Sequence, residues 1–290
     1  MRSMKIIRPI RVEDRESFEE LAFQTSLGIT SLPKDADQLF DKILQSQEAF
    51  DEKKHDPHHH IYIFVLEDLE TNTLMGTCGI KAKTAVTEPL YCYRIENIDN
   101  TSSTRHVPKT LKILRAIKIR NGPSEVCGLY LSPEHRSENL GYLLSYSRFL
   151  FMACHPCRFD DKVIAEMRGY FDEKGENPFW NWVGRHFFDV DYDDAIDRQS
   201  RTTSFIPDIL PKFPIYIDLL PHEVQRTIGK THKNTEAALN LLLKIGFSLT
   251  HEVDIFDAGP KVWAPVKEIV PLANSRVDKV CSTSDSIPET

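Results

Sequence analysis

SEVCGLYLSPEHRSENLGYLLSYSRFLFMACH, residues 124–155, carries the strongest structural signal in the chain. Its first ten residues predict a strand, because they form an apolar run that favours β structure. A polar loop ending at Gly141 follows, and residues 142–155 then place apolar side chains at helical spacing. A strand, a glycine-bearing loop and a helix in this order can hold a pyrophosphate on the helix N-terminus. The stretch therefore predicts a site for a ligand that carries phosphate groups.

The loop at residues 136–141 has a pattern found in a known type of anion site. GNAT-type acyl-CoA transferases carry Arg/Gln-x-x-Gly-x-Gly/Ala between a strand and a helix, and the loop resembles this pattern at Arg136 and Gly141. Asn139 replaces the first glycine. Backbone N–H groups converge on an anion where the backbone adopts unusual dihedral angles, and asparagine enters the left-handed region more readily than other non-glycine residues. By pattern alone, an ordinary loop with a glycine near a helix start explains these residues equally well.

A wider resemblance covers nearly the whole chain. Nine blocks are similar to the arginine N-succinyltransferase family, in the family's order and at nearly its spacing. The blocks are GITSLP (28–33), YIFVLED (62–68), SEVCGLYLSPEHR (124–136), GYLLSYSRFLFMA (141–153), DKVIAEMRG (161–169), DE-x-G-x-x-PFW (172–180), LPKFPIY (210–216), IGKTH (228–232) and DIFDAGP (254–260). The resemblance implies transfer of a succinyl group from succinyl-CoA to the α-amino group of L-arginine. Succinyl-CoA is then a co-substrate, and no tightly bound cofactor is expected.

The resemblance also implies an α+β fold of the GNAT-like acyl-CoA N-acyltransferase type, built from two GNAT-like halves packed together. We expect residues 1–195 to form the first half, with the pyrophosphate loop, and residues 196–270 to form the second, with the catalytic histidine. Periodicity is lost after residue 270, so residues 271–290 are expected to be a disordered tail. A faint internal echo agrees with two halves, because one helix pattern ends at Gly184 and another at Gly246, each followed by a strand pattern.

The family's IG-x-x-H motif maps onto residues 228–232 and makes His232 the expected catalytic residue, with the role of proton donor. The chemistry needs such a group, because an amine must lose its proton to attack a thioester and the leaving thiolate must be stabilised. Histidine suits this task, since its ordinary pKa is about 6.5. The alternative is a structural histidine that precedes the helix at residues 234–246.

Other site residues follow from the same resemblance. Leu129 matches a family position that binds succinyl-CoA, and its backbone is the expected contact with the extended pantetheine arm. Arg136, Asn139 and Gly141 are expected to hold the pyrophosphate. The carboxylate of Glu166 is a candidate acceptor for the arginine guanidinium, and Arg168 is a candidate cation for the succinyl carboxylate. For each of the latter two, an ordinary surface charge is the more common explanation.

The composition is that of an ordinary globular protein. The chain has 290 residues, of which 41% are hydrophobic and 27% charged, so a substantial core is expected. The net charge of -7 argues against general nucleic-acid binding, which needs clustered Lys and Arg. No run approaches the roughly 20 apolar residues of a membrane span. Six scattered cysteines are too few for a disulfide scaffold and predict a cytoplasmic protein.

Two local patterns suggest other chemistry. The run His58-His59-His60 lacks a Cys or carboxylate cluster at matching spacing, so we expect no metal site. The basic run at residues 109–120 is too short for a nucleic-acid site and predicts a solvated helix face or an interface.

Three functional hypotheses stay open on the sequence. The first is arginine succinylation, and the second is acyl transfer to another basic amine or from another acyl-CoA. The third is a catalytically weak acyl-CoA-binding partner subunit. The resemblance favours a homo-oligomer or hetero-oligomer, and the expected ligands are L-arginine and succinyl-CoA, with no nucleic acid and no membrane.

Overall fold

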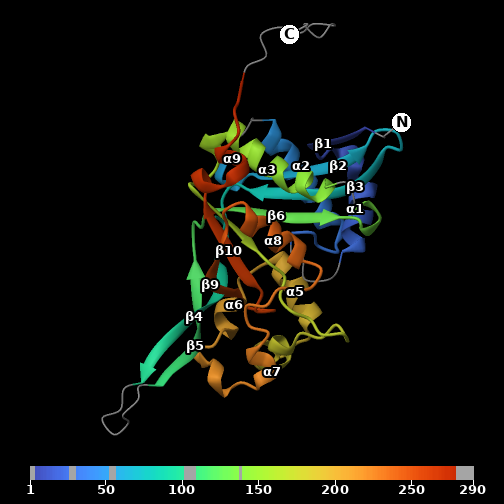
Figure 1. Ribbon diagram of the computed structural model, residues 1–290. Helices are drawn as coiled ribbons and strands as arrows, with labels where there is room; N and C mark the ends of the chain where they lie inside the picture. Colours follow the sequence, from blue (N-terminus) through green and yellow to red (C-terminus); the bar gives the residue numbers. More distant parts are fainter. Residues whose placement is uncertain (1–3, 26–30, 52–56, 101–108, 137–138, 279–290) are drawn as a thin grey trace, which may run out of the picture.

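A single mixed sheet runs through the chain (Figure 1). The computed structural model describes residues 4–25, 31–51, 57–100, 109–136 and 139–278. Within them, the sheet has ten strands in the order β1-β2-β3-β6-β7-β10-β9-β4-β5-β8. Their bounds are β1 Lys5–Pro9, β2 Ile61–Asp68, β3 Thr73–Lys81, β4 Leu90–Asn100, β5 Lys109–Ile119, β6 Ser124–Leu131, β7 Lys162–Glu166, β8 Ile215–Tyr216, β9 Ser248–Asp254 and β10 Pro260–Pro265.

Helices cover both faces of this sheet. They are α1 Arg15–Gln24, α2 Ala36–Phe50, α3 Leu140–Cys154, α4 Arg185–Phe188, α5 Tyr192–Arg201, α6 Ile206–Ile209, α7 His222–Gln225, α8 Glu236–Lys244 and α9 Val270–Ala273. In β2, Tyr62, Phe64 and Leu66 join the core beneath α3, whereas Ile63 and Val65 join the core beneath α1 and α2. The alternation follows from the strand period of two, which sends successive side chains to opposite faces.

Residues on both sides of position 195 build the same sheet. β9 and β10, from the C-terminal part, lie between β7 and β4, which come from the N-terminal part. Position 195 itself lies within α5. Residues 271–273 complete α9, and residues 279–290 lie outside the described residues. The assignment of two GNAT-like halves stays a proposal.

The internal echo is wrong at one of its two glycines. Gly246 does follow the end of α8 in a left-handed conformation, with φ 110°. Gly184, however, lies inside a helical segment that continues to Phe188, with φ -55° and ψ -52°. A Cβ at Gly184 would lie 2.1 Å from the ring of Trp180. The glycine therefore serves close packing of an aromatic ring and does not end the helix.

The basic run at residues 109–120 is a strand and not a helix face. β4 and β5 pair antiparallel along their whole length, from Leu90 opposite Ile119 to Asn100 opposite Lys109. Figure 1 shows them as a long hairpin arm at the lower left. Leu111 and Ile113 flank Lys112, and Ile117 and Ile119 flank Lys118, which is the period of a strand.

Candidate active site

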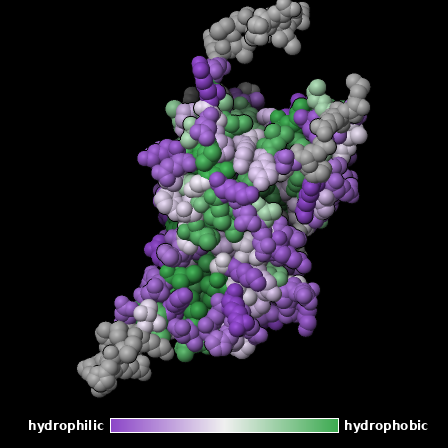
Figure 2. Space-filling model, viewed as in Figure 1, coloured by the Kyte–Doolittle hydropathy of each residue, from purple (hydrophilic) through white to green (hydrophobic). Residues whose placement is uncertain are grey.

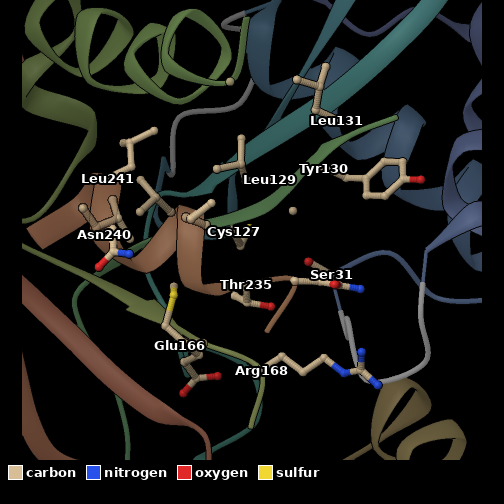
Figure 3. A pocket seen from close by; sticks show the side chains of 18 of the residues that line it. Ser31, Cys127, Leu129, Tyr130, Leu131, Glu166, Arg168, Thr235, Asn240 and Leu241 are labelled. Carbon is tan, nitrogen blue, oxygen red and sulfur yellow. The ribbon is translucent and has the colours of Figure 1, made fainter. Parts of the chain in front are cut away.

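The site begins where two parallel strands separate. β6 and β7 pair through only two residue pairs, Ser124 with Val163 and Glu125 with Ile164. Beyond these pairs a cavity of about 870 Å³ opens between them. One wall consists of residues 125–131 of β6 together with the start of α3, and the other includes Glu166, Met167 and Arg168 at the end of β7. Figure 3 shows Glu166 and Arg168 across the cavity from Leu129 and Leu131.

A β-bulge interrupts β6 along the cavity. In the pairing with β3, Cys127 lies opposite Gly79 and Tyr130 lies opposite Thr77, so Gly128 and Leu129 together oppose one residue. Gly128 has φ 58°, a left-handed conformation that favours glycine. The bulge removes the backbone of Leu129 from the regular ladder where β6 lines the cavity. The backbone contact expected at Leu129 is thus sterically available to an extended ligand.

Asn139, directly before α3, has the backbone conformation that the sequence predicts, whereas residues 137 and 138 of the loop lie outside the described residues. Asn139 is the N-cap of α3 and has φ 62° and ψ 18°, so the expected left-handed conformation is confirmed. Its carbonyl oxygen accepts hydrogen bonds from the N–H groups of Tyr142 and Leu143 at 3.0 and 3.1 Å. A Cβ at Gly141 would meet no atom within 4 Å, so the space beside it is open. Arg136, Asn139 and Gly141 all line the cavity.

Three of the nine sequence blocks meet beside the β7 wall. The N–H of Met167 donates to the carbonyl of Pro260, and the N–H of His232 donates to the carbonyl of Arg168, both at 2.9 Å. A further hydrogen bond of 2.9 Å joins the N–H of Gly229 to the carbonyl of Ala258. Segments near residues 167, 230 and 257, far apart in the sequence, therefore form one structural unit.

His232 lies in this unit, next to the cavity lining. The ring is buried, and its Nδ1 accepts the N–H of Asn234 at 3.1 Å, so the neutral tautomer carries its proton on Nε2. Burial, followed by the charges of Arg168 and Lys233, lowers the pKa of His232 to about 4. The ring is therefore uncharged near neutral pH. Its neighbours Arg168 and Asn234 line the cavity, whereas His232 itself is not among the lining residues.

Glu166 and Arg168 both line the cavity, in different electrostatic settings. The Glu166 carboxylate is 3.1 Å from the ammonium of the buried Lys261, so part of its charge is already balanced. The Arg168 guanidinium lies 4.3 Å from the centre of the Phe171 ring. Burial lowers the pKa of Arg168, and among the described residues no carboxylate lies within ion-pair distance of it.

Two aspartates of the same wall were missed by sequence reasoning. Asp254 and Asp257 line the cavity beside Arg168. Asp257 accepts the N–H groups of Gly169 and Gly259, both at 2.7 Å. Burial, and then the neighbouring Asp257 charge, raises the pKa of Asp254. Both residues belong to the DIFDAGP block, which was the available signal. With Glu166 they place three acidic side chains on this wall; Glu166 is paired with Lys261, and burial favours the protonated form of Asp254.

Two kinds of feature are absent from the described part of the chain. Among those residues, no group of three or more His, Cys, Asp or Glu side chains is arranged to hold a metal ion. No helix in the same ranges is long and apolar enough to cross a bilayer.

The comparisons with known proteins agree with one another. Residues 5–271 match the family model described as arginine N-succinyltransferase beta subunit. Arginine N-succinyltransferases from Escherichia coli and Salmonella schwarzengrund are each 38% identical over 279 residues, which is 96% of this chain and 80% of theirs.

A solved structure shows the same fold. The arginine/ornithine succinyltransferase subunit AI from Pseudomonas aeruginosa is similar with a TM-score of 0.86 and 35% identity, over 95% of this chain and 81% of that one. The predicted mixed α and β fold is thereby confirmed. Family model, relatives and structure all cover nearly the whole chain, and the chain belongs to the arginine N-succinyltransferase family.

Proposed function

We propose that the chain transfers the succinyl group of succinyl-CoA to the α-amino group of L-arginine. The observation that carries this proposal is that Arg136 and the start of α3, the bulged strand β6 and three acidic side chains of the opposite wall line one cavity. Family membership supports both substrates, because the relatives are named for this activity. The proposal assigns the donor to the β6–α3 wall and the acceptor to the β7 wall.

The β6–α3 wall suits the donor. The first N–H groups of α3 have no partners within the helix and carry the positive end of the helix dipole, which favours the pyrophosphate of coenzyme A. Asn139 and Gly141 keep this helix start open. The pantetheine arm then lies along β6, where Leu129 offers backbone groups released by the bulge. In this proposal a backbone N–H there stabilises the oxyanion that forms from the thioester carbonyl oxygen.

The β7 wall suits a basic amino acid. Glu166, Asp254 and Asp257 supply acidic groups that attract a guanidinium and an ammonium. When the neutral amine attacks, an N–C bond forms, the C–S bond breaks, and the amine loses a proton while the thiolate gains one. The acidic wall raises the local concentration of the cation, whereas the donor wall keeps the thioester in place.

His232 is proposed to act at this step as a hydrogen-bond donor. Its Nδ1 is occupied by the N–H of Asn234, which leaves Nε2–H as the donor. Because the pKa is about 4, the ring does not store a second proton at neutral pH. This charge state favours stabilisation of the developing anion over delivery from a preformed imidazolium.

A thiol-release assay with succinyl-CoA tests the proposal. We expect turnover with L-arginine. The Pseudomonas aeruginosa relative is named an arginine/ornithine succinyltransferase, which makes L-ornithine the second amine to try. Turnover with L-ornithine but not with L-arginine would mean that ornithine, and not arginine, is the acceptor. Binding of succinyl-CoA without turnover of either amine would make the chain an acyl-CoA-binding partner subunit and refute the proposal.

A further inference from the structure

Arg148 is a buried cation that the site described above does not use. It lies in the middle of α3 and is only 2% exposed. Its Nε donates to the carbonyl of Ser145 at 3.1 Å, and its Nη2 donates to the Ser145 hydroxyl at 2.7 Å. No carboxylate of the described residues lies within ion-pair distance of the guanidinium. Both of its partners are therefore neutral groups of its own helix.

A second buried arginine, Arg8, has the carboxylate partners that Arg148 lacks. Arg8 on β1 is also buried, and its guanidinium lies 2.6 Å from Asp14 and 2.5 Å from Glu67. The pKa of Arg8 is raised by these partners, whereas burial lowers the pKa of Arg148. A guanidinium stays charged in proteins, and a buried charge without a counter-charge is costly. Arg148 thus has an unfilled requirement for an anion.

The position of Arg148 indicates where that anion comes from. Arg148 lines the cavity between β6 and β7. Its charge acts on the thiols of Cys78 and Cys127, which flank the β3–β6 bulge. The guanidinium is therefore on the donor wall, beside the place assigned to the thioester. An anionic group carried at the far end of a short acyl chain would reach it.

The alternative cation, Arg168, is in a less suitable place. It lies on the β7 wall with Glu166, Asp254 and Asp257, and the Asp257 charge acts on it directly. An acyl carboxylate beside Arg168 would lie near these acidic side chains, and those of them that are unprotonated repel a second negative charge. The sequence-based assignment of the succinyl carboxylate to Arg168 is thus less favourable than an assignment to Arg148.

We propose that Arg148 binds the terminal carboxylate of the acyl group, so that the cavity selects a dicarboxylic acyl-CoA over a monocarboxylic one. The inference rests on the proposed function for the identity of the donor. A guanidinium and a carboxylate form paired, charge-assisted hydrogen bonds, which give both affinity and direction. The pair would also fix the thioester carbonyl at the bulge. Binding of the correct donor supplies the counter-charge that the free chain lacks.

Arg148→Met tests the proposal through binding alone. Calorimetry on the full chain would measure Kd for succinyl-CoA, butyryl-CoA and free CoA. The variant should raise Kd for succinyl-CoA about 10- to 100-fold. Kd for butyryl-CoA, which has a methyl in place of the carboxylate, and for CoA should change less than about threefold. Because no acceptor is present, the result does not depend on whether arginine is the amine.

Three outcomes would overturn the proposal. Equal weakening of all three ligands would mean that Arg148 contacts the pyrophosphate. No change in any of them would mean that Arg148 is structural. Loss of the preference for succinyl-CoA in Arg168→Met, with Arg148→Met unaffected, would place the carboxylate on the β7 wall.

Two further variants control for folding. Arg148→Lys keeps a cation at the position and should retain more of the succinyl preference than Arg148→Met; the reverse order would contradict the proposal. Arg8→Met removes a buried arginine that is already paired, so it should lower the unfolding temperature and leave the donor preference unchanged. Arg148→Met leaves no carboxylate unpaired and should unfold at no lower temperature than the unmodified chain. A marked fall would indicate a structural role.

Discussion

The charge state of His232 shows how strongly burial and neighbouring charges change the pKa of one residue. The IG-x-x-H motif identifies the histidine, and the ordinary pKa of a histidine suits a proton donor. In the fold, burial beside Arg168 and Lys233 lowers that pKa to about 4. The folded chain therefore binds a proton less readily than the unfolded chain between pH 6.5 and pH 4. The stability gained from a neutral His232 is complete above pH 6.5 and is lost as the pH falls toward 4.

Replacing His232 is expected to slow catalysis more than it changes binding. His232→Ala should lower kcat about 10²-fold, because a hydrogen-bond donor to the developing charge is lost. The KM for succinyl-CoA should change little, since His232 adjoins the β7 wall and not the wall assigned to the donor. Steady-state kinetics over pH 6 to 9 measure both values. A rate limb near pH 6.5 that disappears in the variant would show that the histidine titrates at its ordinary pKa, contrary to the role proposed for it.

Asp254 offers a prediction in which stability and binding change in opposite directions. Its raised pKa means that the folded chain holds a proton that the unfolded chain releases, so stability falls as the pH rises through that window. Asp254→Asn keeps the oxygen that accepts the N–H groups of Phe256 and Asp257. The variant should unfold at a higher temperature at pH 7 and show a higher KM for arginine. An unchanged arginine KM would remove Asp254 from the acceptor site.

Sequence reasoning at this scale succeeds where the cause is local. The left-handed conformation of Asn139 follows from its own backbone preference. Asp254, Asp257 and Arg148 were not predicted as site residues, because their importance depends on which groups lie across the cavity. A carboxylate or a guanidinium in a sequence gives no sign of whether its partner will be a neighbour in the fold.

The element that matters most is α3 with the loop before it. The loop, the helix and β6 were all predicted, since strand and helix periods differ clearly within residues 124–155. The predicted helix end at Gly184 was wrong. This glycine makes room for the Trp180 ring, and the sequence alone does not distinguish it from a glycine that ends a helix. The strand at residues 109–119 was missed for a similar reason, since its basic residues hid the alternation.

Gly141 separates the role of α3 in binding from its role in folding. A Cβ at this position meets open space, so Gly141→Val should leave the unfolding temperature within a few degrees of the original value. The new side chain would occupy the cavity beside the helix start and raise the KM for succinyl-CoA. The KM for arginine should be unchanged. Kinetics with an unaltered KM for succinyl-CoA would count against a pyrophosphate at this loop.

At the scale of the whole molecule, the sheet joins parts of the chain that the sequence separates. β10 pairs with β7, and β9 pairs with β4. Strands from the C-terminal part of the chain therefore lie between strands from the N-terminal part. The strand at the start of residues 124–155 was predicted, but the order of the strands was not, because it depends on pairings between residues more than 80 positions apart, such as Trp263 with Ile164. Figure 2 shows hydrophilic residues over most of the visible face, interrupted by hydrophobic groups along its middle.

This interleaving predicts one cooperative unfolding transition. Separating residues 1–195 from residues 196–270 would leave β7 without β10 and β4 without β9, so neither part should unfold alone. Differential scanning calorimetry of the full chain should give a single peak, with equal calorimetric and van't Hoff enthalpies. Two resolved peaks would show that the halves are independently stable.

The most direct test of the proposed function is a crystal structure of the chain with bound succinyl-CoA. We predict the pyrophosphate at the N–H groups of residues 139–141, the pantetheine along β6, and the thioester beside the bulge at Gly128. Succinyl-CoA bound elsewhere, with the space between β6 and β7 closed or filled by the chain's own side chains, would contradict this prediction.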